Sequence, residues 1–587
     1  MKAWLREDSQ EWANAQSAEA QPEQVIPTRL LDLGCGDDTV KLIETDKLKL
    51  KDKQIDWITL SHRWGNCQHL TTTKGTLPQH LKGIPLEKLP QTFNDAVIVT
   101  RRLSIRYLWI DAICIVQDDK DDWKKEAAIM GSIYEHSTCT IAAHAAVNDE
   151  GGFLDSAMAA PEMVQLPAKS SDSESERENF YLSPTNDGIS DLNYSPLSRR
   201  GWVLQERLLP HRIIHFTPTH IYWESSGSLG TRNEHNELLS DANYPTRPPI
   251  PRHPDQPTET PRLWLETVER YTSCGLTHSS DKLIAISGLS RQMQSRTRKG
   301  YIAGIWHDQL HLGLLWVRKP TGTSSAPSPP KRDYDLASSW SWASIDGPVA
   351  YPIAVSHHER GREQPKLTAE TVLLCAIAPG CKGSDPPWID KPAQLMLGAA
   401  LRSCRVSMLA QRGRLLQRVP YVLRPAGEAG QQGEGNGGRI EPYAETAQRL
   451  GMGMLAGSEA ESELLRENGY KPIGAVIEDP QISDETVLRY VVDEAANPVG
   501  WVALDDEGDP ELNGPELHPG SSIELFWDFL CFKVASFRDT FGVEVTFILV
   551  VKEKPEGKPG EFVRVGMGLV KGTVYFQDVQ PIMILLC

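Results

Sequence analysis

The residues that are the best candidates for a chemical role lie between positions 107 and 144. There an apolar run leads into an acidic turn and an amphipathic helix. Trp123, Ala127 and Met130 recur at helical spacing, so their side chains form one apolar stripe. At about 100° per residue, Glu126 falls within that stripe. A carboxylate on a core-facing stripe is costly unless it is paired or lines a cleft. Glu126 is therefore a candidate catalytic carboxylate, and the alternative is a structural carboxylate bonded to an arginine or to backbone.

Four aspartates, at positions 118, 119, 121 and 122, stand directly before this helix. Aspartate favours helix N-caps and first turns, where it accepts backbone N–H bonds and meets the positive end of the dipole. The D-D-K-D-D order lacks the ligand spacing of a calcium loop, so we expect no metal site here. Asp118 and Asp119 stay candidates for contact with a ligand.

Three apolar runs provide the elements that would position these residues. They cover 55–60, 107–116 and 138–143, and they alternate with a helix near 90–103 and with the helix that carries Glu126. This alternation predicts a parallel sheet with helices on its faces. The run 107–116 is also short enough to be a buried helical segment.

Ligand groups in open α/β sheets gather where the strands end. Ser61, Arg63 and Trp64 directly follow the first predicted strand, and Asp111 lies within or at the end of the second. We therefore expect these four as ligand-binding residues at one sheet edge. Glu126 would face the same edge only if its helix begins near it.

A third block reads SPLSRRGWVLQERLLPHRIIHF. Gly201 and Trp202 predict a turn into a short helix, and a β-hairpin follows at 212–224. We expect Gln205, Glu206 and Arg207 to pair with the acidic turn and to hold this block on the sheet.

The sequence predicts that the chain is divided into several structural regions. A stretch with LDLGCG and VKLIE, within 1–54, is read as a β-hairpin, although an incomplete glycine motif leaves a methyltransferase as an alternative. A domain is expected at 55–216, a mixed α/β extension at 217–360, and a β-rich domain at 361–587.

Composition narrows the class of protein. The 587 residues carry a net charge of −17 with no basic stripe, which argues against a nucleic-acid partner. No apolar run reaches the roughly 20 residues that span a bilayer, and the ten cysteines form no CxxC pair. We therefore expect a cytoplasmic protein.

Taken together, three blocks resemble the fungal heterokaryon incompatibility (HET) domain. They are LSHRWG, the segment LPQTFNDAVIVTRRLSIRYLWIDAICIVQDDKDDWKKEAAIMGSIYEHSTCTIAA, and the third block above, and they occur in the family's order. One departure is His62-Arg63, where the family usually has an aromatic after the serine. The resemblance marks nine signature residues with structural roles: Trp109, Cys114, Gln117, Trp123, Gly201, Trp202, Gln205, Glu206 and Arg207.

The resemblance implies an effector or sensor in incompatibility and innate-immune-like cell death, working with protein partners or by self-assembly. HET domains also resemble Toll/interleukin receptor (TIR) domains, some of which cleave NAD with a Glu in a W-x-x-E pattern, as in Trp123 to Glu126. This implies a TIR-like parallel sheet and, as an alternative function, an NAD glycohydrolase. In that case Trp64 would stack on a base and Arg63 would meet phosphate of this nucleotide ligand.

A third hypothesis is a hydrolase that uses Cys114 with His144 or His62. Cys114 lies in an apolar run, where cysteine is usually an inert core residue. The sequence therefore favours the first two hypotheses. No cofactor is required by any of the motifs.

Overall fold

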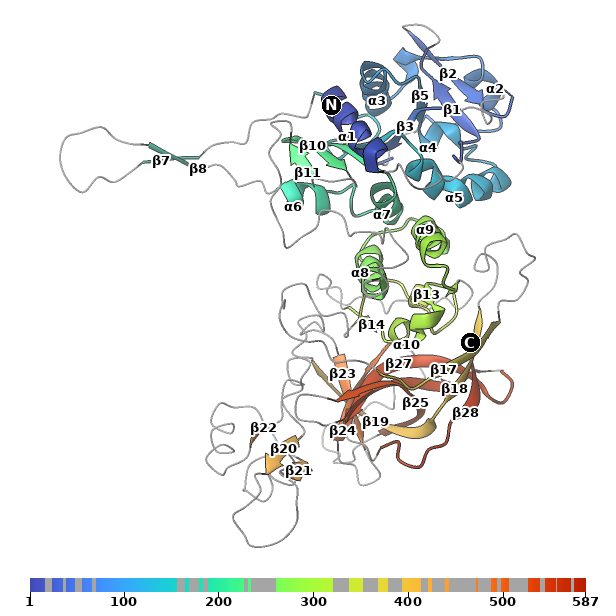
Figure 1. Ribbon diagram of the computed structural model, residues 1–587, viewed down its shortest axis with the longest axis vertical. Coiled ribbons are helices and arrows are strands. Elements are labelled where there is room, and N and C mark those ends of the chain that lie inside the picture. The colour runs from blue at the N-terminus through green and yellow to red at the C-terminus, as the bar shows by residue number, and fades with distance from the viewer. Residues whose placement is uncertain are drawn as a thin grey trace, which may run out of the picture. The chain divides into compact units, whose positions relative to one another are not determined.

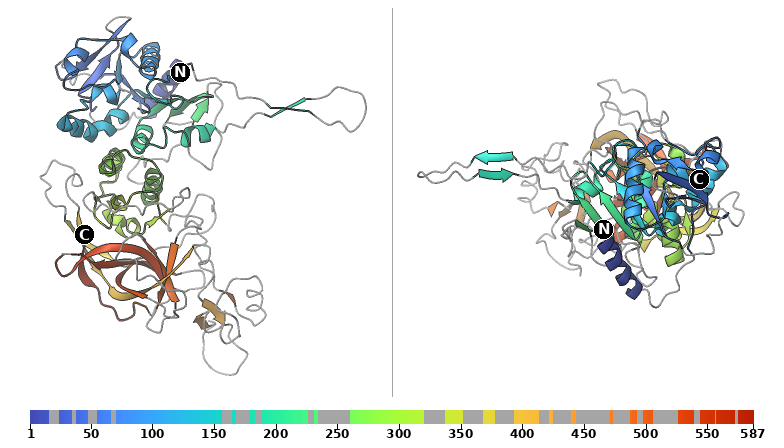
Figure 2. Two further views of the ribbon diagram at one scale, coloured as in Figure 1. Left: turned by 180° about the vertical axis from the view of Figure 1, so that it is seen from behind. Right: turned by 90° about the horizontal axis from the view of Figure 1, so that it is seen from above.

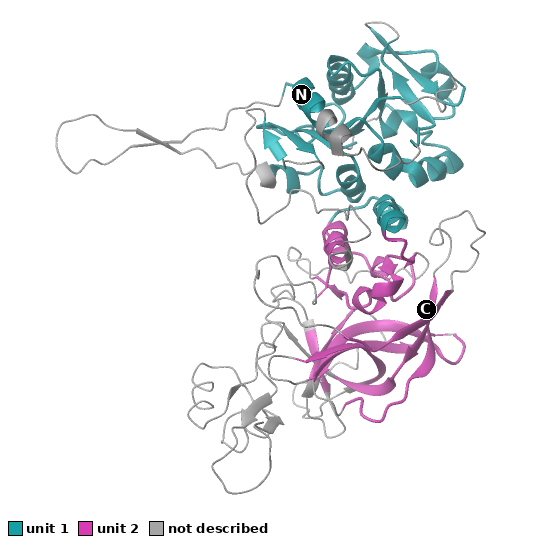
Figure 3. Ribbon diagram, viewed as in Figure 1, with its two compact units in different colours: residues 1–254, 274–296 teal, residues 255–273, 297–587 magenta. Residues whose placement is uncertain are grey.

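The computed structural model divides the chain into two compact units, shown in different colours in Figure 3. Unit 1 consists of residues 1–254 and 274–296, and unit 2 consists of residues 255–273 and 297–587. The structure describes residues 1–15, 24–34, 38–47, 55–65, 70–155, 164–167, 179–182, 188–225, 231–233, 260–319, 337–351, 368–377, 393–412, 421–424, 439–442, 471–472, 487–492, 498–505, 526–538, 544–555, 557–571 and 575–587.

Unit 1 is built on a nine-stranded mixed sheet (Figure 1). Its strands, in spatial order, are β11 (Thr231–Asn233), β10 (Ile221–Ser225), β9 (Arg212–Phe216), β6 (Cys139–Ala143), β3 (Trp57–Ser61), β5 (Tyr107–Trp109), β1 (Arg29–Asp32), β2 (Thr39–Glu44) and β4 (Ile84–Pro85). The four central strands, β9, β6, β3 and β5, run parallel. The outer strands pair antiparallel, so the expected parallel sheet forms the centre of a mixed one.

The order of the parallel strands reverses at β3. The chain passes from β3 to β5 on one side, and then returns across β3 to β6 and β9 on the other side. Such a reversal is a topological switch point, and ligands of open α/β sheets bind at the carboxyl ends of the strands there. Ser61, the last residue of β3, lies at this position.

The helices of unit 1 include the three that the sequence predicts, near 90–103, around Glu126 and after Gly201. They are α1 (Lys2–Ala15), α2 (Leu77–His80), α3 (Gln91–Arg102), α4 (Asp111–Cys114), α5 (Lys120–Glu135), α6 (Gly188–Asn193), α7 (Gly201–Leu208) and α9 (Ser287–Thr297), with the 3-10 helices η2 (Leu86–Lys88) and η3 (Ser279–Asp281). Successive strand residues face opposite sides of a sheet. Trp57 of β3 donates to the carbonyl of Ile133 in α5, whereas His62, just past β3, meets Phe93 of α3 edge-on.

The predicted strand 107–116 is wrong beyond Trp109. β5 covers Tyr107–Trp109, and Asp111–Cys114 forms the one-turn helix α4. The Asp111 carboxylate accepts the backbone N–H of Ala112 at 2.7 Å, which favours the turn. A run of apolar residues has no periodicity that would separate a short strand from a buried helical turn.

Both hairpins that the sequence predicts in this unit are confirmed. β1 and β2 pair from Arg29↔Glu44 to Asp32↔Lys41, so LDLGCG leads from one strand into another and not into a phosphate-binding helix. β9 and β10 pair from Phe216↔Ile221 to Arg212↔Ser225. A further two-stranded ribbon consists of β7 (Val164–Pro167) and β8 (Asn179–Leu182).

Unit 2 confirms the prediction of a β-rich C-terminal region. Six of its strands form a closed ring in the order β19–β23–β24–β27–β26–β25, because β26 joins β25 to β27 and β25 pairs with β19 (Figure 2). Their bounds are β19 (Leu401–Arg412), β23 (Val487–Val492), β24 (Pro498–Leu504), β25 (Phe526–Arg538), β26 (Glu544–Glu553) and β27 (Glu561–Lys571). Buried valines and isoleucine fill the ring, including Val406, Val502 and Ile548.

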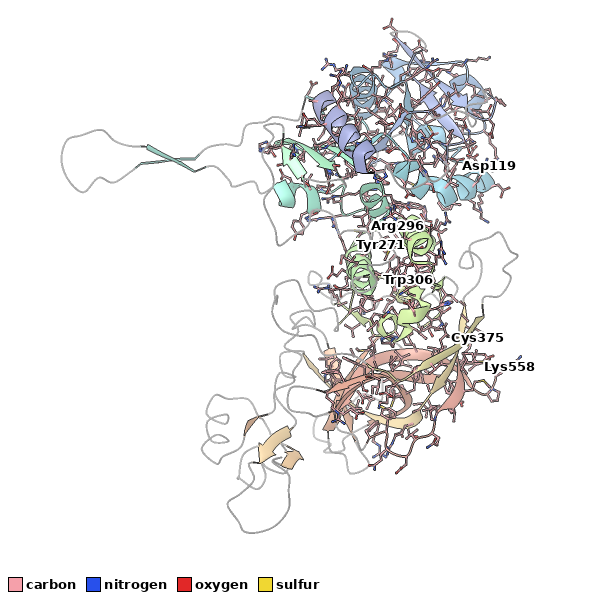
Figure 4. The ribbon with its side chains drawn as sticks, in the orientation of Figure 1. Asp119, Tyr271, Arg296, Trp306, Cys375 and Lys558 are labelled. Atoms are coloured by element: carbon pink, nitrogen blue, oxygen red, sulfur yellow. The ribbon has the colours of Figure 1, made fainter. Side chains whose placement is uncertain are left out.

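Further strands extend the ring or pair beside it. They are β16 (Thr368–Ala369), β17 (Val372–Ile377), β18 (Gln394–Ala399) and β28 (Ile582–Leu586), and the separate strands β20 (Tyr421–Arg424), β21 (Arg439–Pro442) and β22 (Lys471–Pro472). Cys375, labelled in Figure 4, lies on β17 at the end of this sheet.

The mixed middle region of unit 2 packs around aromatic side chains. Its elements are α8 (Thr260–Thr272), β12 (Tyr301–Ile302), β13 (Ile305–Trp306), η4 (His307–Gln309), α10 (Leu310–Gly313), β14 (Val317–Arg318), η5 (Trp342–Ser344) and β15 (Val349–Ala350). Trp264 meets Trp306 edge-on at 5.6 Å, and Tyr271 meets Trp342 at 5.8 Å; Tyr271 and Trp306 are labelled in Figure 4.

Arg564 of β27 is fully buried and joins this middle region to the ring. Its guanidinium lies over the Trp316 ring, pairs with Asp505 at 2.8 Å and donates to the carbonyls of Leu314 and Trp316. A buried arginine is tolerated because these acceptors satisfy its donors.

None of the helices in the described part of the chain has the length and apolar character needed to span a bilayer.

Candidate functional site

Three separate segments bring polar side chains to the carboxyl end of β3. Ser61 ends β3, Asp111 begins α4 directly after β5, and Glu206 comes from α7, between β6 and β9. The sequence predicts Ser61 and Asp111 at one edge from the strand pattern. Glu206 joins them because the third block folds back to the switch point.

The Ser61 hydroxyl donates a hydrogen bond of 2.5 Å to Oε2 of Glu206. Both side chains are buried, with exposed fractions of 2% and 5%. Burial raises the pKa of Glu206 to about 7, although the nearby Arg200 guanidinium and the Ser61 hydroxyl both act to lower it. Near neutral pH this carboxyl is therefore divided between its protonated and ionised forms.

His62 occupies the other side of the same strand end. Its Nε2 lies 3.2 Å from Oδ1 of Asp149, and its Nδ1 lies 3.8 Å from Oδ1 of Asp111. Its backbone carbonyl accepts a hydrogen bond from the Arg200 guanidinium. His62 therefore lies buried between two carboxylates.

Trp64 and Arg63 lie at the more exposed side of the cluster, and both are partly exposed. The indole N–H of Trp64 donates to Oδ2 of Asp111 at 3.0 Å, which fixes the ring. Gly65 follows with φ of +80°, and a Cβ there would lie 2.4 Å from that of Asn148. The strand-end turn is therefore packed tightly against the loop that carries Asp149.

This cluster combines a carboxyl that titrates near neutrality, a hydroxyl that donates to it, and a histidine between two further carboxylates. Such a group can accept or supply a proton and can accept hydrogen bonds from a ligand's hydroxyl or amide groups. Three carboxylates beside one arginine do not favour an anionic ligand group at its centre.

Glu126 is on α5 and has its own set of neighbours. It is on the buried face of α5, as the helical spacing predicts, and its exposed fraction is 0%. Burial raises its pKa, while Thr28 and Arg29 act to lower it. The Thr28 hydroxyl is close, but neither carboxylate oxygen of Glu126 has a hydrogen bond of good geometry.

The neighbours of Glu126 are structural contacts. Arg29 donates at 2.8 Å to the carbonyl of Cys114 and pairs with Asp122 on the first turn of α5. The groups that act on Glu126 are Thr28, Arg29, Asp122 and Lys125, none of which lies at the end of β3.

Asp118 and Asp119 hold the start of α5. Asp119, labelled in Figure 4, is the N-cap and accepts the backbone N–H of Asp121 at 3.1 Å. Asp118 accepts the backbone N–H of Lys74 at 2.7 Å. Asp119 therefore caps the helix, and Asp118 anchors the loop that carries Lys74.

The signature residues of the middle block are mainly core and turn residues. Trp109 is buried and meets Tyr134 edge-on at 5.7 Å. Gln117 donates to the carbonyls of Asp111 and Ile115. Burial raises the pKa of the Cys114 thiol to about 12, so it is not a thiolate nucleophile at neutral pH.

The signature residues of the third block fasten α7 to its neighbours. Trp202 meets Trp123 of α5 edge-on and donates to Asp281 at 3.2 Å, and Gly201 donates to the carbonyl of Gly275. Gln205 is buried, with Oε1 close to where a Cβ on Gly288 would lie. Arg207 pairs with Glu224 and Glu206 with Ser61, and these pairings replace the expected one with the acidic turn.

Sequence reasoning missed Asp149 and Arg200 and assigned no role to His62 at this site. Asp149 follows the third parallel strand by a short loop, so the same strand-end argument could have found it. Arg200 contributes through its contact with a backbone carbonyl, for which the sequence carries no signal.

The fold and the site together define the class of this protein. It contains an α/β domain with a polar cluster at the switch point of its sheet. Residues 57–206 match the family model for the heterokaryon incompatibility protein (HET), so this chain carries a HET domain. The match includes Ser61, Asp111 and Glu206. No curated protein and no solved structure matches the chain. The similarity to TIR domains stays a prediction.

Proposed function

We propose that this chain is a cytoplasmic effector or sensor of heterokaryon incompatibility that triggers cell death. The cluster around Glu206 controls whether cell death is triggered. The observation that carries the proposal is that all three sequence blocks meet at the sheet's switch point. The first and third blocks are joined there by the Ser61–Glu206 hydrogen bond, and the middle block supplies Asp111, which accepts the indole N–H of Trp64. Because every block of the matched region contributes a side chain to this cluster, a functional role explains the cluster better than packing alone.

The cluster is suited to sense a ligand with hydroxyl or amide donors. Glu206, Asp111 and Asp149 supply acceptors, and Trp64 supplies an aromatic surface at the exposed side. The ribose and base of a nucleotide, or a polar segment of a protein partner or of a second copy, have this chemistry. Because the Glu206 carboxyl titrates near pH 7, binding would change its protonation and the packing of α7.

Cleavage of NAD with Glu126 as the catalytic carboxylate is the alternative that the TIR resemblance implies. A catalytic carboxylate must contact the reacting atoms. Glu126 is completely buried and lies beside Thr28 and Arg29 of the β1 strand region. This placement supports a structural role for Glu126 and favours an effector that acts through binding or assembly.

The test is inducible expression in a filamentous fungal host, with cell viability as the readout. We expect the wild-type chain to cause cell death and Ser61→Ala and Glu206→Gln to lose this effect at equal protein level. Glu150→Gln, which changes an exposed carboxylate near the site in sequence, is the matched control and should kill like wild type. Viable cells with the wild-type chain, or death with all variants, would contradict the proposal.

The same cultures distinguish the enzymatic alternative if their NAD content is measured. We expect NAD to stay constant until membrane integrity is lost. An early fall in NAD that Glu126→Gln abolishes, with folding retained, would replace the binding mechanism by NAD cleavage.

A further inference from the structure

A second polar group in unit 1 forms a continuous row of hydrogen bonds from the surface to a buried carboxylate. The Ser195 hydroxyl lies 2.7 Å from Nδ1 of His144. Nε2 of His144 lies 2.9 Å from Nδ1 of His215, and Nε2 of His215 lies 2.9 Å from Oε2 of Glu224. Neither the sequence motifs nor the cluster around Glu206 accounts for this row.

The sheet itself places the three inner members. β6 and β9 are in register at Ala142↔His215, and His144 follows two residues after Ala142, on the same face of the sheet. In the β9–β10 hairpin, His215 pairs with Tyr222, so Glu224 is its diagonal neighbour on that face. Arg207 holds the Glu224 carboxylate from α7 at 3.3 Å.

The chemistry of the end group fixes the position of each proton. An ionised carboxylate can only accept, so Nε2 of His215 carries hydrogen and, in a neutral ring, Nδ1 of His215 accepts. Nε2 of His144 must then donate to it, which leaves Nδ1 of His144 as an acceptor. The single hydroxyl proton of Ser195 has two acceptors in reach, Nδ1 of His144 at 2.7 Å and Oγ of Ser198 at 3.2 Å. The shorter contact, to His144, is the one a nucleophilic serine makes with its general base.

The surroundings keep this base neutral and leave the serine accessible. Burial, and next the neighbouring His215, hold the pKa of His144 well below its usual value of 6.5. Ser195 is only partly buried and lies in the turn between α6 and α7, next to Tyr194, which is 68% exposed. The backbone N–H of Ser198 donates to the Ser195 oxygen at 3.2 Å and fixes its position.

We propose that Ser195 is the nucleophile of a second site on this chain, which hydrolyses small esters, with His144 as general base and His215 and Glu224 as positioning residues. The Ser195 oxygen forms a bond to the ester carbonyl carbon while its proton moves to Nδ1 of His144. The ester C–O bond breaks, and the alcohol leaves with that proton. Water then attacks the acyl-serine and gives its proton to His144, and the serine is restored with release of the carboxylic acid.

This site is separate from the one proposed to control the incompatibility output. Ser195, His144, His215 and Glu224 share none of the hydrogen bonds around Glu206. Failure of either proposal therefore leaves the other standing.

The test uses the purified full chain and a fluorophosphonate probe, which forms a bond from phosphorus to an activated serine oxygen with loss of fluoride. We expect labelling at Ser195, located by peptide mass analysis, and hydrolysis of p-nitrophenyl acetate. Ser195→Ala should abolish both, and His144→Gln should slow both by about a hundredfold or more. Ser132→Ala, which changes another partly buried serine on α5, is the matched control and should leave both unchanged.

The pH profile separates the positioning role of His215 from a merely structural one. His215→Gln keeps an acceptor for His144 but removes the neighbour that depresses the pKa of His144. We therefore expect the pH midpoint of labelling to move upward in this variant. Two results would overturn the proposal. One is absence of Ser195 labelling in wild-type chain that circular dichroism shows to be folded, and the other is equal labelling of wild type and Ser195→Ala.

Discussion

At the scale of single residues, Glu206 makes the free energy of unfolding of the HET domain depend on pH near neutrality. Folding transfers this carboxyl into a buried position beside Ser61, which raises its pKa from the ordinary 4.5 to about 7. Between these values the folded chain holds a proton that the unfolded chain has released. The contribution of Glu206 to stability is therefore complete below pH 4.5 and is lost as the pH rises through 7.

The substitution Glu206→Gln should remove this dependence. Because each unit of pKa shift corresponds to about 1.4 kcal/mol, the stability of the variant relative to wild type should rise by about 2–3 kcal/mol from about pH 5 to about pH 8. Scanning calorimetry of both proteins across this range measures the difference. Glu150→Gln, an exposed carboxylate, should run parallel to wild type; a Glu206→Gln curve that does the same would contradict the prediction.

Arg564 of unit 2 gives a second prediction at this scale. Arg564→Met removes the guanidinium that pairs with the buried Asp505, so we expect a loss of about 3–5 kcal/mol in the free energy of unfolding. The double variant Arg564→Met/Asp505→Leu should recover part of this loss, because the buried charge is also gone. Denaturant unfolding of the two variants measures this recovery, and equal stabilities would show that the unpaired Asp505 charge is not the cause of the loss.

At the scale of elements, the contact between α5 and α9 relies on two glycines. A Cβ on Gly131 would lie 2.7 Å from the Cα of Gly288, and one on Gly288 would lie 2.9 Å from the Cα of Gly131. The two helix backbones therefore approach each other directly, and Arg291 of α9 donates to the carbonyl of Ala128 at the same contact.

Adding a methyl group there should separate the helices. Gly131→Ala should lower the free energy of unfolding by about 1–3 kcal/mol, as overpacking does, despite the better helix propensity of alanine. Thermal unfolding by circular dichroism measures the loss. In Gly75→Ala, where the nearest heavy atom lies 3.8 Å away, the midpoint should stay the same; an unchanged midpoint for Gly131→Ala would exclude a tight contact.

The elements also show what the sequence could predict. Strands β3 and β6, helices α3 and α5, and both hairpins follow from apolar periodicity and turn residues, and so does the buried position of Glu126. The same reasoning failed within 107–116, where uniform apolarity hides the change from β5 to α4. It also could not tell that Glu206 meets Ser61, because that pairing depends on how α7 returns to the sheet.

The row from Ser195 to Glu224 was missed for a related reason. Its members are spread over 144–224, and only strand register brings His144, His215 and Glu224 to one face. Spacing along the sequence gives no measure of register between strands that are not neighbours in the chain.

At the scale of the whole molecule, the chain leaves unit 1 after residue 254, enters unit 2, and returns for residues 274–296 before it completes unit 2. The returning segment supplies Gly275, Asp281 and the whole contact of α9 with α5; Arg296, near the end of this segment, is labelled in Figure 4. The HET domain is therefore incomplete without residues beyond the matched range 57–206.

A truncation series tests this dependence. The chain that ends at residue 254 should be markedly less stable than the one that ends at residue 296, because it leaves the α9-facing sides of α5 and α7 uncovered. Thermal unfolding and resistance to proteolysis compare the two. Equal stability would mean that residues 274–296 contribute little to unit 1.

The returning segment also sets an order of events during protein synthesis. The first 254 residues leave the ribosome with the buried faces of α5 and α7 lacking their cover, and α9 follows only after the residues of α8 have been made. Protein synthesis adds roughly 5–20 residues per second, so α9 is made a few seconds after residue 254. During that interval the nascent HET domain presents apolar surface that chaperones and other nascent chains can bind.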